Sequence, residues 1–545
     1  MRLNKIGLVV FLLTSAFFAE AGVNLKNGNF YVGYTDIVVP GKGETLQLSR
    51  TYNSKSPEDG WYGIGWGSPF ETFLKVSADG SAVIHENGAG ARTRFTPKKA
   101  INPKDSAMKI VEAIRKSRTL TDKVAEEMVE KLSKNEEYRH AYARRYQVSM
   151  QLAKDTVLYS NTRGMQELKV VKDGYVRSFT DGKSHKFNKK GQLVEMKFKT
   201  GNKFVLSYDK KTGKLKSVKD NYAKQLFFEW YSDGKIKAAW SKAGKKVKYV
   251  FDEGDLVESS DVAGNTYKFS YDSNHNMTSV SYKDGSKMSM EFDKKTQFVS
   301  KVTDRNGEWT SYKYESNPKK PEKHYWTLVT KSSGKAKPIT NRYEYEIKTR
   351  PDGSHYTYRI LTEISSIRTE TIYSECCSLP LKISRGKRVT NFEYTKDGFM
   401  KSKTSNDGKY VKIAYDQKYK KISRVENNDG WTTFKYDKRG NLSTAKNNRG
   451  NQVLLIYDSK QRISKMVERN PKSKKKRTLA FKYNSLGKPV EISMNKVGKI
   501  NVKYDNFGEI KKVESKSGHR MALQVTQAFQ NLLSIVKPAG VNLNM

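Results

Sequence analysis

Cysteine is nearly absent from this 545-residue chain, since only Cys376 and Cys377 occur and they are adjacent. Two cysteines exclude a disulfide framework of the kind that holds small secreted domains together. The pair could form a strained vicinal disulfide, join another chain, or remain as two buried thiols. A metal site is not expected there, because the nearest histidine, His355, stands alone.

Long apolar runs are also missing beyond the first residues. Arg2 and Lys5 precede the apolar run Ile6–Phe18, and small residues close the segment at Ala19 and Ala21. This pattern is typical of a secretory signal peptide, with cleavage between Ala21 and Gly22, and the run is short for a membrane span. An uncleaved anchor is the alternative. We therefore expect an exported chain, located in the periplasm, on the cell surface or outside the cell, with no transmembrane segment after cleavage.

Acidic residues are few for a chain so rich in bases. Lysine and arginine number 102 against 57 aspartates and glutamates, which gives a formal charge of +45 and a pI near 9.8. Removing residues 1–21 leaves +44. A charge this large favours anionic partners and says nothing about the fold. No nucleic-acid reader motif is present, so we predict no specific nucleic-acid partner.

Catalytic motifs are lacking as well. The seven histidines are scattered, and no HExxH, GxSxG or Walker pattern occurs. The aspartates recur at a fixed place in a repeat, which is typical of turn residues. We therefore predict a non-enzymatic protein with no cofactor, no metal and no catalytic residues.

The chain does contain a recurring sequence motif, which is clearest at residues 431–442 as WTTFKYDKRGNL. An alternating run ends in an aromatic anchor, an aspartate often follows, and a glycine turn comes next. Successive anchors are separated by about 21 residues, and regular spacing of this kind is typical of repeat arrays. The anchors are Phe187, Tyr208, Trp230, Phe251, Tyr271, Phe292, Tyr314, Tyr394, Tyr415, Tyr436, Tyr457, Tyr483 and Tyr504.

The repeat reads as a ladder of β-hairpins. An apolar residue lies two positions before nearly every anchor, as Phe434 does before Tyr436, so both share one face of a strand. Aspartate after the anchor can accept hydrogen bonds from nearby backbone N–H groups, and glycine supplies a positive φ. Each unit should therefore hold about two short strands and two turns.

These units resemble the YD (RHS) repeats of bacterial Rhs and WapA-type proteins, toxin-complex shells and teneurins, over roughly residues 187–515. The resemblance implies a mainly β fold, in which a long β-sheet strip curls into a shell or barrel. Residues 22–100 resemble the module that opens such shells, on the strand Leu46–Ser54, Gly60, Gly63 and the Gly65-Trp66 pair. Only about 30 residues follow the last unit, and no closing motif is found, so a C-terminal toxin domain is not expected.

The expected organisation has seven parts. They are a signal peptide (1–21), the opening module (22–100), a helical insertion (101–155), a first repeat array (156–315), degenerate repeats with the two cysteines (316–390), a second array (391–515) and a C-terminal capping helix (516–545). In the insertion, glycine vanishes and Tyr138, Tyr142 and Tyr146 follow one helix face. This stripe either packs on the shell or docks a protein partner.

Two groups of residues are candidates for binding. Trp61 and Trp66 could stack on sugar rings, or could both be core residues. The basic loop Lys472, Lys474, Lys475, Lys476 and Arg477 could contact an anion, or could be a solvated turn.

The function that follows is an exported, non-enzymatic YD-repeat protein that binds or scaffolds at the cell envelope. Its expected ligand is a carbohydrate or another anionic surface polymer, since the family implies carbohydrate or surface contact and the charge favours anions. The alternative is a shell or chaperone component of a toxin or secretion system that holds a separately encoded effector.

Overall fold

The computed structural model describes residues 20–515, except 40, 42, 78–79, 98–101, 150–151, 161–165, 199–200, 243, 245, 334–335, 352, 376–377, 460–461, 471–474, 485–488, 496 and 505–509. Residues 1–19, Cys376, Cys377 and the predicted capping helix (516–545) lie outside the described residues. No described helix is long and apolar enough to cross a membrane.

A single antiparallel sheet of 33 strands, each hydrogen-bonded to the next in the sequence, dominates the fold and confirms the predicted β-strip. Its first half comprises β10 (Val157–Ser160), β11 (Gln166–Val171), β12 (Gly174–Phe179), β13 (Ser184–Asn188), β14 (Leu193–Lys197), β15 (Lys203–Tyr208), β16 (Leu215–Asp220), β17 (Gln225–Trp230), β18 (Ile236–Ser241), β19 (Val247–Asp252), β20 (Asp255–Ser260), β21 (Thr266–Tyr271), β22 (Met277–Tyr282), β23 (Lys287–Phe292), β24 (Val299–Thr303) and β25 (Trp309–Ser316).

The second half continues without a break in the ladder. It comprises β26 (His324–Ser333), β27 (Ala336–Thr349), β28 (His355–Ile364), β29 (Ile367–Tyr373), β30 (Pro380–Arg385), β31 (Arg388–Tyr394), β32 (Met400–Ser405), β33 (Tyr410–Tyr415), β34 (Ile422–Asn427), β35 (Gly430–Tyr436), β36 (Leu442–Asn447), β37 (Gln452–Tyr457), β38 (Ile463–Asn470), β39 (Lys475–Tyr483), β40 (Pro489–Met494), β41 (Gly498–Tyr504) and β42 (Ile510–Ser515). Among the described strands the order is linear, with β10 and β42 at the two ends.

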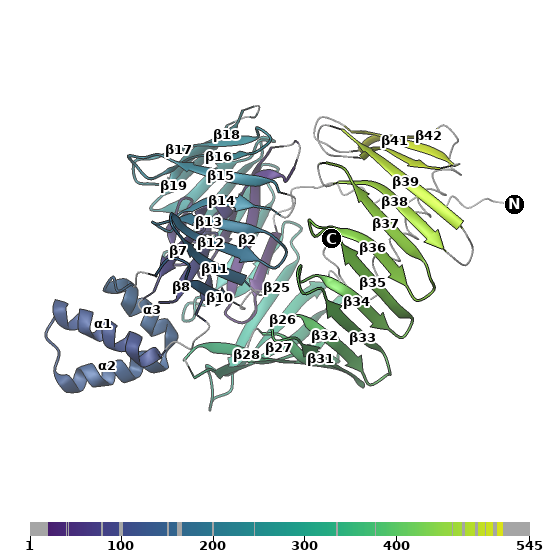
Figure 1. Ribbon diagram of the computed structural model, residues 1–545. Helices are drawn as coiled ribbons and strands as arrows, with labels where there is room; N and C mark the ends of the chain where they lie inside the picture. The colour runs from purple at the N-terminus through teal and green to yellow at the C-terminus, as the bar shows by residue number, and fades with distance from the viewer. Residues whose placement is uncertain are drawn as a thin grey trace.

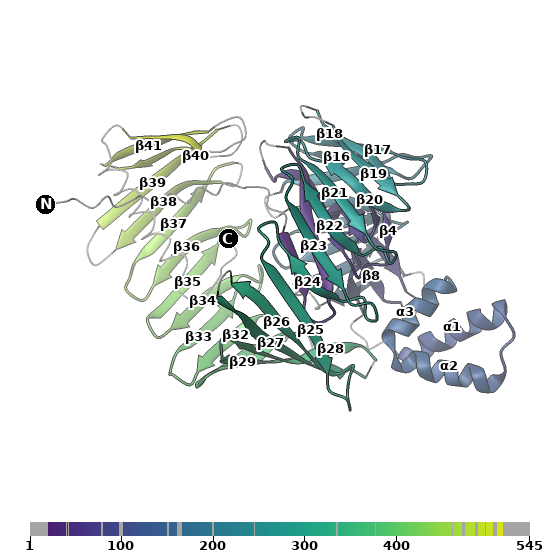
Figure 2. The ribbon, with the colours of Figure 1, turned by 180° about the vertical axis from the view of Figure 1, so that it is seen from behind.

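The strip curls strongly. It rises through β10–β18 on the side seen in Figure 1 and descends through β19–β25 on the side seen in Figure 2. The strands from β26 to β31 cross the base, and β32–β42 rise again as a second arm beside the first (Figure 1). This curvature gives the shell that the repeat resemblance implies.

The opening module lies inside the first arm. It contains β1 (Glu20–Asn24), β2 (Asn29–Val39), β3 (Leu46–Asn53), β4 (Asp59–Gly60), β5 (Gly63–Ile64), β6 (Trp66–Gly67), a 3-10 turn (Pro69–Glu71), β7 (Phe73–Val76), β8 (Ala82–Glu86) and β9 (Ala91–Phe95). Apolar side chains of this module and of β10–β24 form one shared core. The module therefore fills the inside of the first arm, and neither part has a complete core alone.

A buried ion pair fastens the module to the strip. The Arg50 guanidinium contacts Asp36 at 2.9 Å, and both side chains are fully buried. From the strip, Tyr249 donates its hydroxyl hydrogen bond to Asp36 at 2.8 Å, and Ser259 accepts from Arg50 at 2.5 Å. Because a buried charge is costly unless it is paired, these four residues fix how the module sits against β19 and β20.

The predicted helical insertion is present as α1 (Pro103–Ser117), α2 (Asp122–Lys134) and α3 (Glu136–Arg145). The side chain of Asn135 accepts a hydrogen bond from the backbone N–H of Tyr138 at 3.0 Å and so caps α3. The three helices bury their own apolar cluster, which is separate from the core of the strip. The insertion is therefore a small unit with a core of its own.

The structure explains why the repeat needs its aromatic anchor. The strand register shifts at a β-bulge directly before the anchor in nearly every unit, and the anchor then faces a residue of the next strand. Tyr415, for example, pairs with Ile422, and the carbonyl oxygen of Ile422 accepts a hydrogen bond from the Tyr436 hydroxyl at 2.6 Å. Each anchor thus holds the bulge of the repeat before it.

This contact recurs along the whole strip. Nine anchors donate such a hydrogen bond to the preceding repeat, at 2.6–2.9 Å: Tyr208, Trp230, Tyr271, Tyr314, Tyr394, Tyr415, Tyr436, Tyr457 and Tyr483. Phe251 and Phe292 occupy the same bulge position without a hydroxyl. The side chain of Tyr504 lies outside the description, although its backbone shows the same register shift.

The predicted turn role of the aspartates also holds. The carboxylate of Asp437 accepts hydrogen bonds from the backbone N–H groups of Arg439 and Asn441, both at 2.8 Å. Gly440 in that turn has a φ of +79°, which a side chain would strain.

The sequence analysis missed one anchor. Tyr373 lies one repeat length before Tyr394 and follows a register shift. It pairs with Pro380, whose carbonyl oxygen accepts a hydrogen bond from the Tyr394 hydroxyl at 2.7 Å. The degenerate segment is thus part of the same ladder, with longer strands in β26–β28.

Candidate functional site

A cavity with a volume of about 1890 Å³ lies where the insertion, the opening module and the strip meet. Its floor comes from β7–β9, one wall from α3, another from β10–β12, and its rim from turns around residues 350–355, 396–399 and 419–420 of the strip. Curling of the strip brings these turns close to the insertion: a Cβ atom at Gly353 would lie 2.3 Å from the carbonyl oxygen of Lys134. We call this space the cationic cavity.

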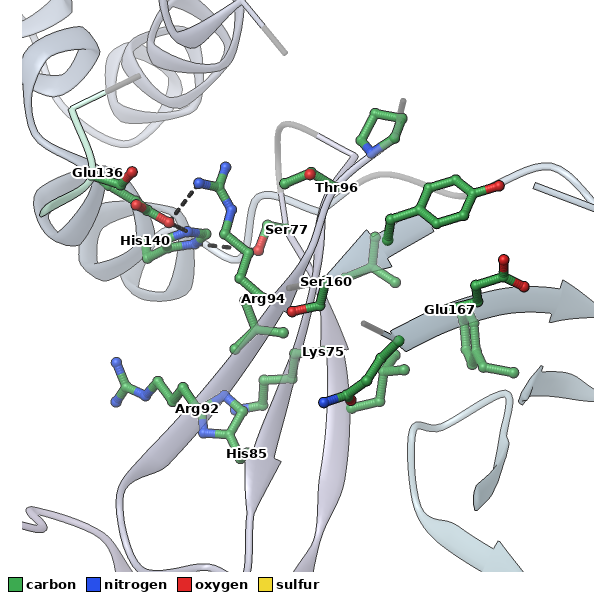
Figure 3. Close-up of a pocket in the computed structure, with 18 of the residues that line it drawn as sticks. Lys75, Ser77, His85, Arg92, Arg94, Thr96, Glu136, His140, Ser160 and Glu167 are labelled. Carbon is green, nitrogen blue, oxygen red and sulfur yellow. Dashed lines mark hydrogen bonds and ion pairs between the residues drawn. The ribbon is translucent and has the colours of Figure 1, made fainter. Parts of the chain in front are cut away.

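The floor follows from strand alternation. In the register of β7–β9, Phe73 faces His85, which faces Arg92, and Lys75 faces Val83, which faces Arg94. Alternate residues of a strand share one face, so all six point to the cavity side while their neighbours enter the core. Figure 3 shows Arg92 beside His85 on this floor.

The helical wall follows from the periodicity of an α-helix. Glu136, His140 and Arg144 are spaced by four residues, so they lie on one face of α3. Arg94 reaches from the floor to Glu136 at 2.5 Å, and the Ser77 hydroxyl lies 3.3 Å from Nδ1 of His140 (Figure 3). These polar contacts attach α3 to the module.

Basic side chains predominate in the lining. Five acidic residues (Glu136, Glu137, Glu167, Glu375 and Asp397) face nine lysines and arginines (Lys75, Arg92, Arg94, Arg144, Lys189, Lys190, Arg350, Lys396 and Lys420). Three of these nine have a carboxylate partner, through Arg92–Glu58, Arg94–Glu136 and Lys420–Asp397. In the described part of the chain, the other six have no carboxylate within ion-pair distance.

The pKa values reflect this excess of positive charge. Burial, with the charges of Arg92, Lys75 and Arg144, lowers the pKa of His85 to about 3, so this imidazole stays neutral at physiological pH. Burial and the nearby charge of Arg92 also lower the pKa of Arg144. The cavity is therefore suited to an anionic ligand, which would relieve the repulsion.

The two predicted sugar-stacking residues, Trp61 and Trp66, lie against the core of the first arm. Trp66 is fully buried and donates its indole hydrogen bond to the Tyr271 hydroxyl at 2.9 Å. Of the two alternatives for Trp66, the core residue is confirmed and the stacking platform is wrong, because the core closes over the ring. Trp61 is half-buried, with its ring edge-on to Trp230 at 5.2 Å.

The other predicted sites lie apart from the cavity. In the basic loop, Lys472 and Lys474 fall outside the described residues, Lys475 begins β39 without a described side chain, and Lys476 and Arg477 are exposed on that strand. Ala21 and Gly22, the predicted cleavage junction, lie in β1 and pair with Val32 and Tyr31. Within the described residues, no cluster of His, Cys, Asp and Glu could hold a metal ion.

Two family models match the chain. Residues 20–95 match a domain of unknown function (DUF6531), and residues 252–287 match the RHS repeat. The second match covers β20–β22 with the anchor Tyr271, inside the ladder described above. The chain thus contains RHS repeats.

Two curated relatives match this RHS-repeat protein over a short N-terminal region. The tRNA nuclease WapA of Bacillus subtilis and the tRNA3(Ser)-specific nuclease WapA of Bacillus spizizenii are each 40% identical to it over 76 residues, which is 14% of this chain and 3% of theirs. The chain thus spans a small part of these relatives. Among solved structures, TcdB2-TccC3 is similar over 89% of this chain and 30% of its own, with 9% identity and a TM-score of 0.37.

Proposed function

We propose that this RHS-repeat protein is exported, acts without catalysis, and binds a segment of an anionic polymer, such as an acidic glycan of the cell envelope, in the cationic cavity. The observation that carries the proposal is the set of six lining cations without a carboxylate partner among the described residues. Unpaired charge in a partly enclosed space favours a ligand that supplies the opposite charge. The signal-peptide pattern at residues 1–21 supports export.

The size of the cavity favours a polymer segment. Sites for small ligands measure about 300–1,000 Å³, so 1890 Å³ has room for several sugar or phosphate units. A folded domain of about 50 residues has a radius of gyration near 10 Å, which corresponds to a sphere of roughly 8,000 Å³. Tyr159, Tyr175 and Tyr419 in the lining offer rings for sugar contact.

One arrangement in the cavity resembles a catalytic set. Ser77, His140 and Glu136 lie in line, with the Glu136 carboxylate 3.4 Å from Nε2 of His140. Arg94 holds that carboxylate at the shorter distance of 2.5 Å. A carboxylate engaged by arginine is a weak partner for a developing imidazolium, which supports binding over catalysis.

A second candidate is a shell that holds a separately encoded effector. The curvature of the strip into two neighbouring arms favours it (Figure 1). It predicts a tight complex with one protein, and polymer binding that does not depend on the cavity.

The test compares two variants with the same loss of charge. Lys189→Gln/Lys190→Gln/Lys396→Gln removes three unpaired cations from the cavity, and Lys435→Gln/Lys438→Gln/Lys446→Gln removes three exposed lysines from the second arm. Affinity for polygalacturonate and for polyglycerol phosphate would be measured on the chain from Gly22, from low to high salt.

We expect at least tenfold weaker binding for the cavity variant than for the arm variant. Equal losses in the two variants would show general surface attraction, since simple counter-ion effects depend on charge number alone. The proposal would then fall, and the search would move to protein partners of the shell or of the insertion.

A further inference from the structure

We propose that the cavity floor contains an oxyanion subsite, formed by Arg92, Arg94, Arg144 and His85, which binds one phosphate or carboxylate group of the ligand in exchange for Glu136. This inference rests on the proposed function and names the group that the cavity recognises. In the unliganded protein, Glu136 occupies the position that the ligand oxyanion would take on Arg94.

One donor of this subsite is held in place before any ligand arrives. The imidazole of His85 stacks on the Phe73 ring, with centroids 4.3 Å apart and planes 13° apart. Strand pairing of β8 with β9 places Arg92 directly opposite His85. A fixed donor reduces the entropy lost on binding.

One buried polar atom points to a missing partner. Nδ1 of His85 has no hydrogen-bond partner among the described residues, although the residue is only 5% exposed. The Glu58 carboxylate lies 3.9 Å from Nδ1 of His85, which is too far for a hydrogen bond. Buried polar groups are nearly always hydrogen-bonded, so an unpartnered imidazole nitrogen in a cavity wall indicates a site for a ligand. Neutral His85 carries one N–H that it can donate to an oxyanion.

Positive charge predominates around the floor. Lys75, Arg92, Arg94 and Arg144 lie there together, with the Glu58 carboxylate 3.5 Å from Arg92 and Glu136 paired with Arg94. The lowered pKa values of His85 and Arg144 agree with this excess. An oxyanion with several acceptor oxygens would satisfy arginine and histidine donors together.

The insertion can move as a unit. Its apolar cluster, to which α3 contributes Ala143, is separate from the core of the strip, so the three helices can shift together without exposing that cluster. The Arg94–Glu136 ion pair and the Ser77–His140 contact hold α3 on the floor. A ligand oxyanion that takes Arg94 breaks the first contact, which makes Glu136 an internal competitor of the ligand.

The decisive comparison is Glu136→Gln against Glu137→Gln. Both residues line the cavity from the first turn of α3 and both changes remove one negative charge, but only Glu136 pairs with Arg94. The probes are inorganic phosphate, acetate, polyglycerol phosphate, polygalacturonate and neutral dextran, measured by calorimetry. We expect Glu136→Gln to raise the affinity for the anionic probes about five- to tenfold and Glu137→Gln less than twofold.

Hydrogen exchange in α3 gives a second readout, because release of Glu136 from Arg94 removes a contact that holds α3 on the floor. It should rise when the anionic polymer binds to the wild-type chain.

Equal effects of Glu136→Gln and Glu137→Gln, or unchanged hydrogen exchange in α3 when the polymer binds, would overturn the subsite. The proposed function would survive that result if the triple-lysine cavity variant still lost polymer binding. If the wild-type chain bound neither polymer, both proposals would fall together.

Discussion

The hydrogen bond from Tyr436 to the preceding repeat gives the sharpest test of the ladder. Tyr436→Phe removes the hydroxyl that donates to the carbonyl oxygen of Ile422 at 2.6 Å and leaves the ring in place. Burial raises the pKa of Tyr436 to about 12, so the hydroxyl is a proton donor throughout the physiological range. The substitution therefore isolates one contact between two repeats.

The expected loss is about 1–2 kcal/mol. A hydrogen bond contributes about 0.5–1.5 kcal/mol to stability, and a half-buried acceptor left without its donor adds part of its desolvation cost. One to two kcal/mol corresponds to a factor of about 5–30 in an opening equilibrium. Because repeats stabilise only their neighbours, the effect should be confined to β34–β36.

Hydrogen exchange of individual strands is the right assay, since a long repeat array does not unfold in one step. Tyr410→Phe is the matched control: Tyr410 lies in β33, and its hydroxyl makes no hydrogen bond to the described residues. We expect faster exchange in β34–β36 for Tyr436→Phe and a change below twofold for Tyr410→Phe. Equal exchange in the two variants, or a loss of protection along the whole strip, would refute the ladder.

Three further outcomes follow from contacts described above. Asp36→Ala leaves the buried Arg50 unpaired and should lower the free energy of unfolding by about 3–5 kcal/mol. Thermal unfolding measures this loss, and a melting curve like that of Asp407→Ala, a control at an exposed aspartate, would contradict the prediction. Hydrogen bonds from the backbone and hydroxyl of Thr212 hold the pKa of Asp209 below 3.8 in the folded protein, so the ionised carboxylate stabilises this turn above pH 3.8. The turn should loosen as the pH falls through the folded-state pKa, and hydrogen exchange in the turn that already rises at about pH 5 would contradict this. Gly353→Val should push the end of α2 off the strip and increase proteolysis of the insertion, whereas Gly386→Val, with the same left-handed backbone and open space around it, should not.

The strip was predictable because its signal is local and repeated. Alternation toward an aromatic anchor, aspartate and glycine at fixed offsets, and a nearly constant period all report on hairpins that contact their sequence neighbours. Tyr373 was missed because Pro380 and the two cysteines replace the usual turn residues after it. Its distance from Tyr394, which equals one repeat length, was the available signal.

The candidate site was not predictable in the same way. The alternation of Arg92 and Arg94 places two cations on one strand face, and the spacing of Glu136, His140 and Arg144 places three polar groups on one helix face. Their meeting depends on how the insertion docks on the module, which no local pattern encodes. The two alternatives for Trp66 stayed open for a related reason, since only the packing of the strip around the module shows that its ring is enclosed.

The shared core also determines how long the N-terminal strands remain uncovered during synthesis of the chain. Phe30 and Trp66 emerge early, yet the core that covers them is complete only when residues as late as Val299 have been made. At typical synthesis rates of about 5–20 residues per second, that gap of roughly 250 residues lasts about 12–50 s. During this interval the first strands stay apolar and uncovered, so the chain needs either a holdase or rapid passage out of the cell to avoid aggregation.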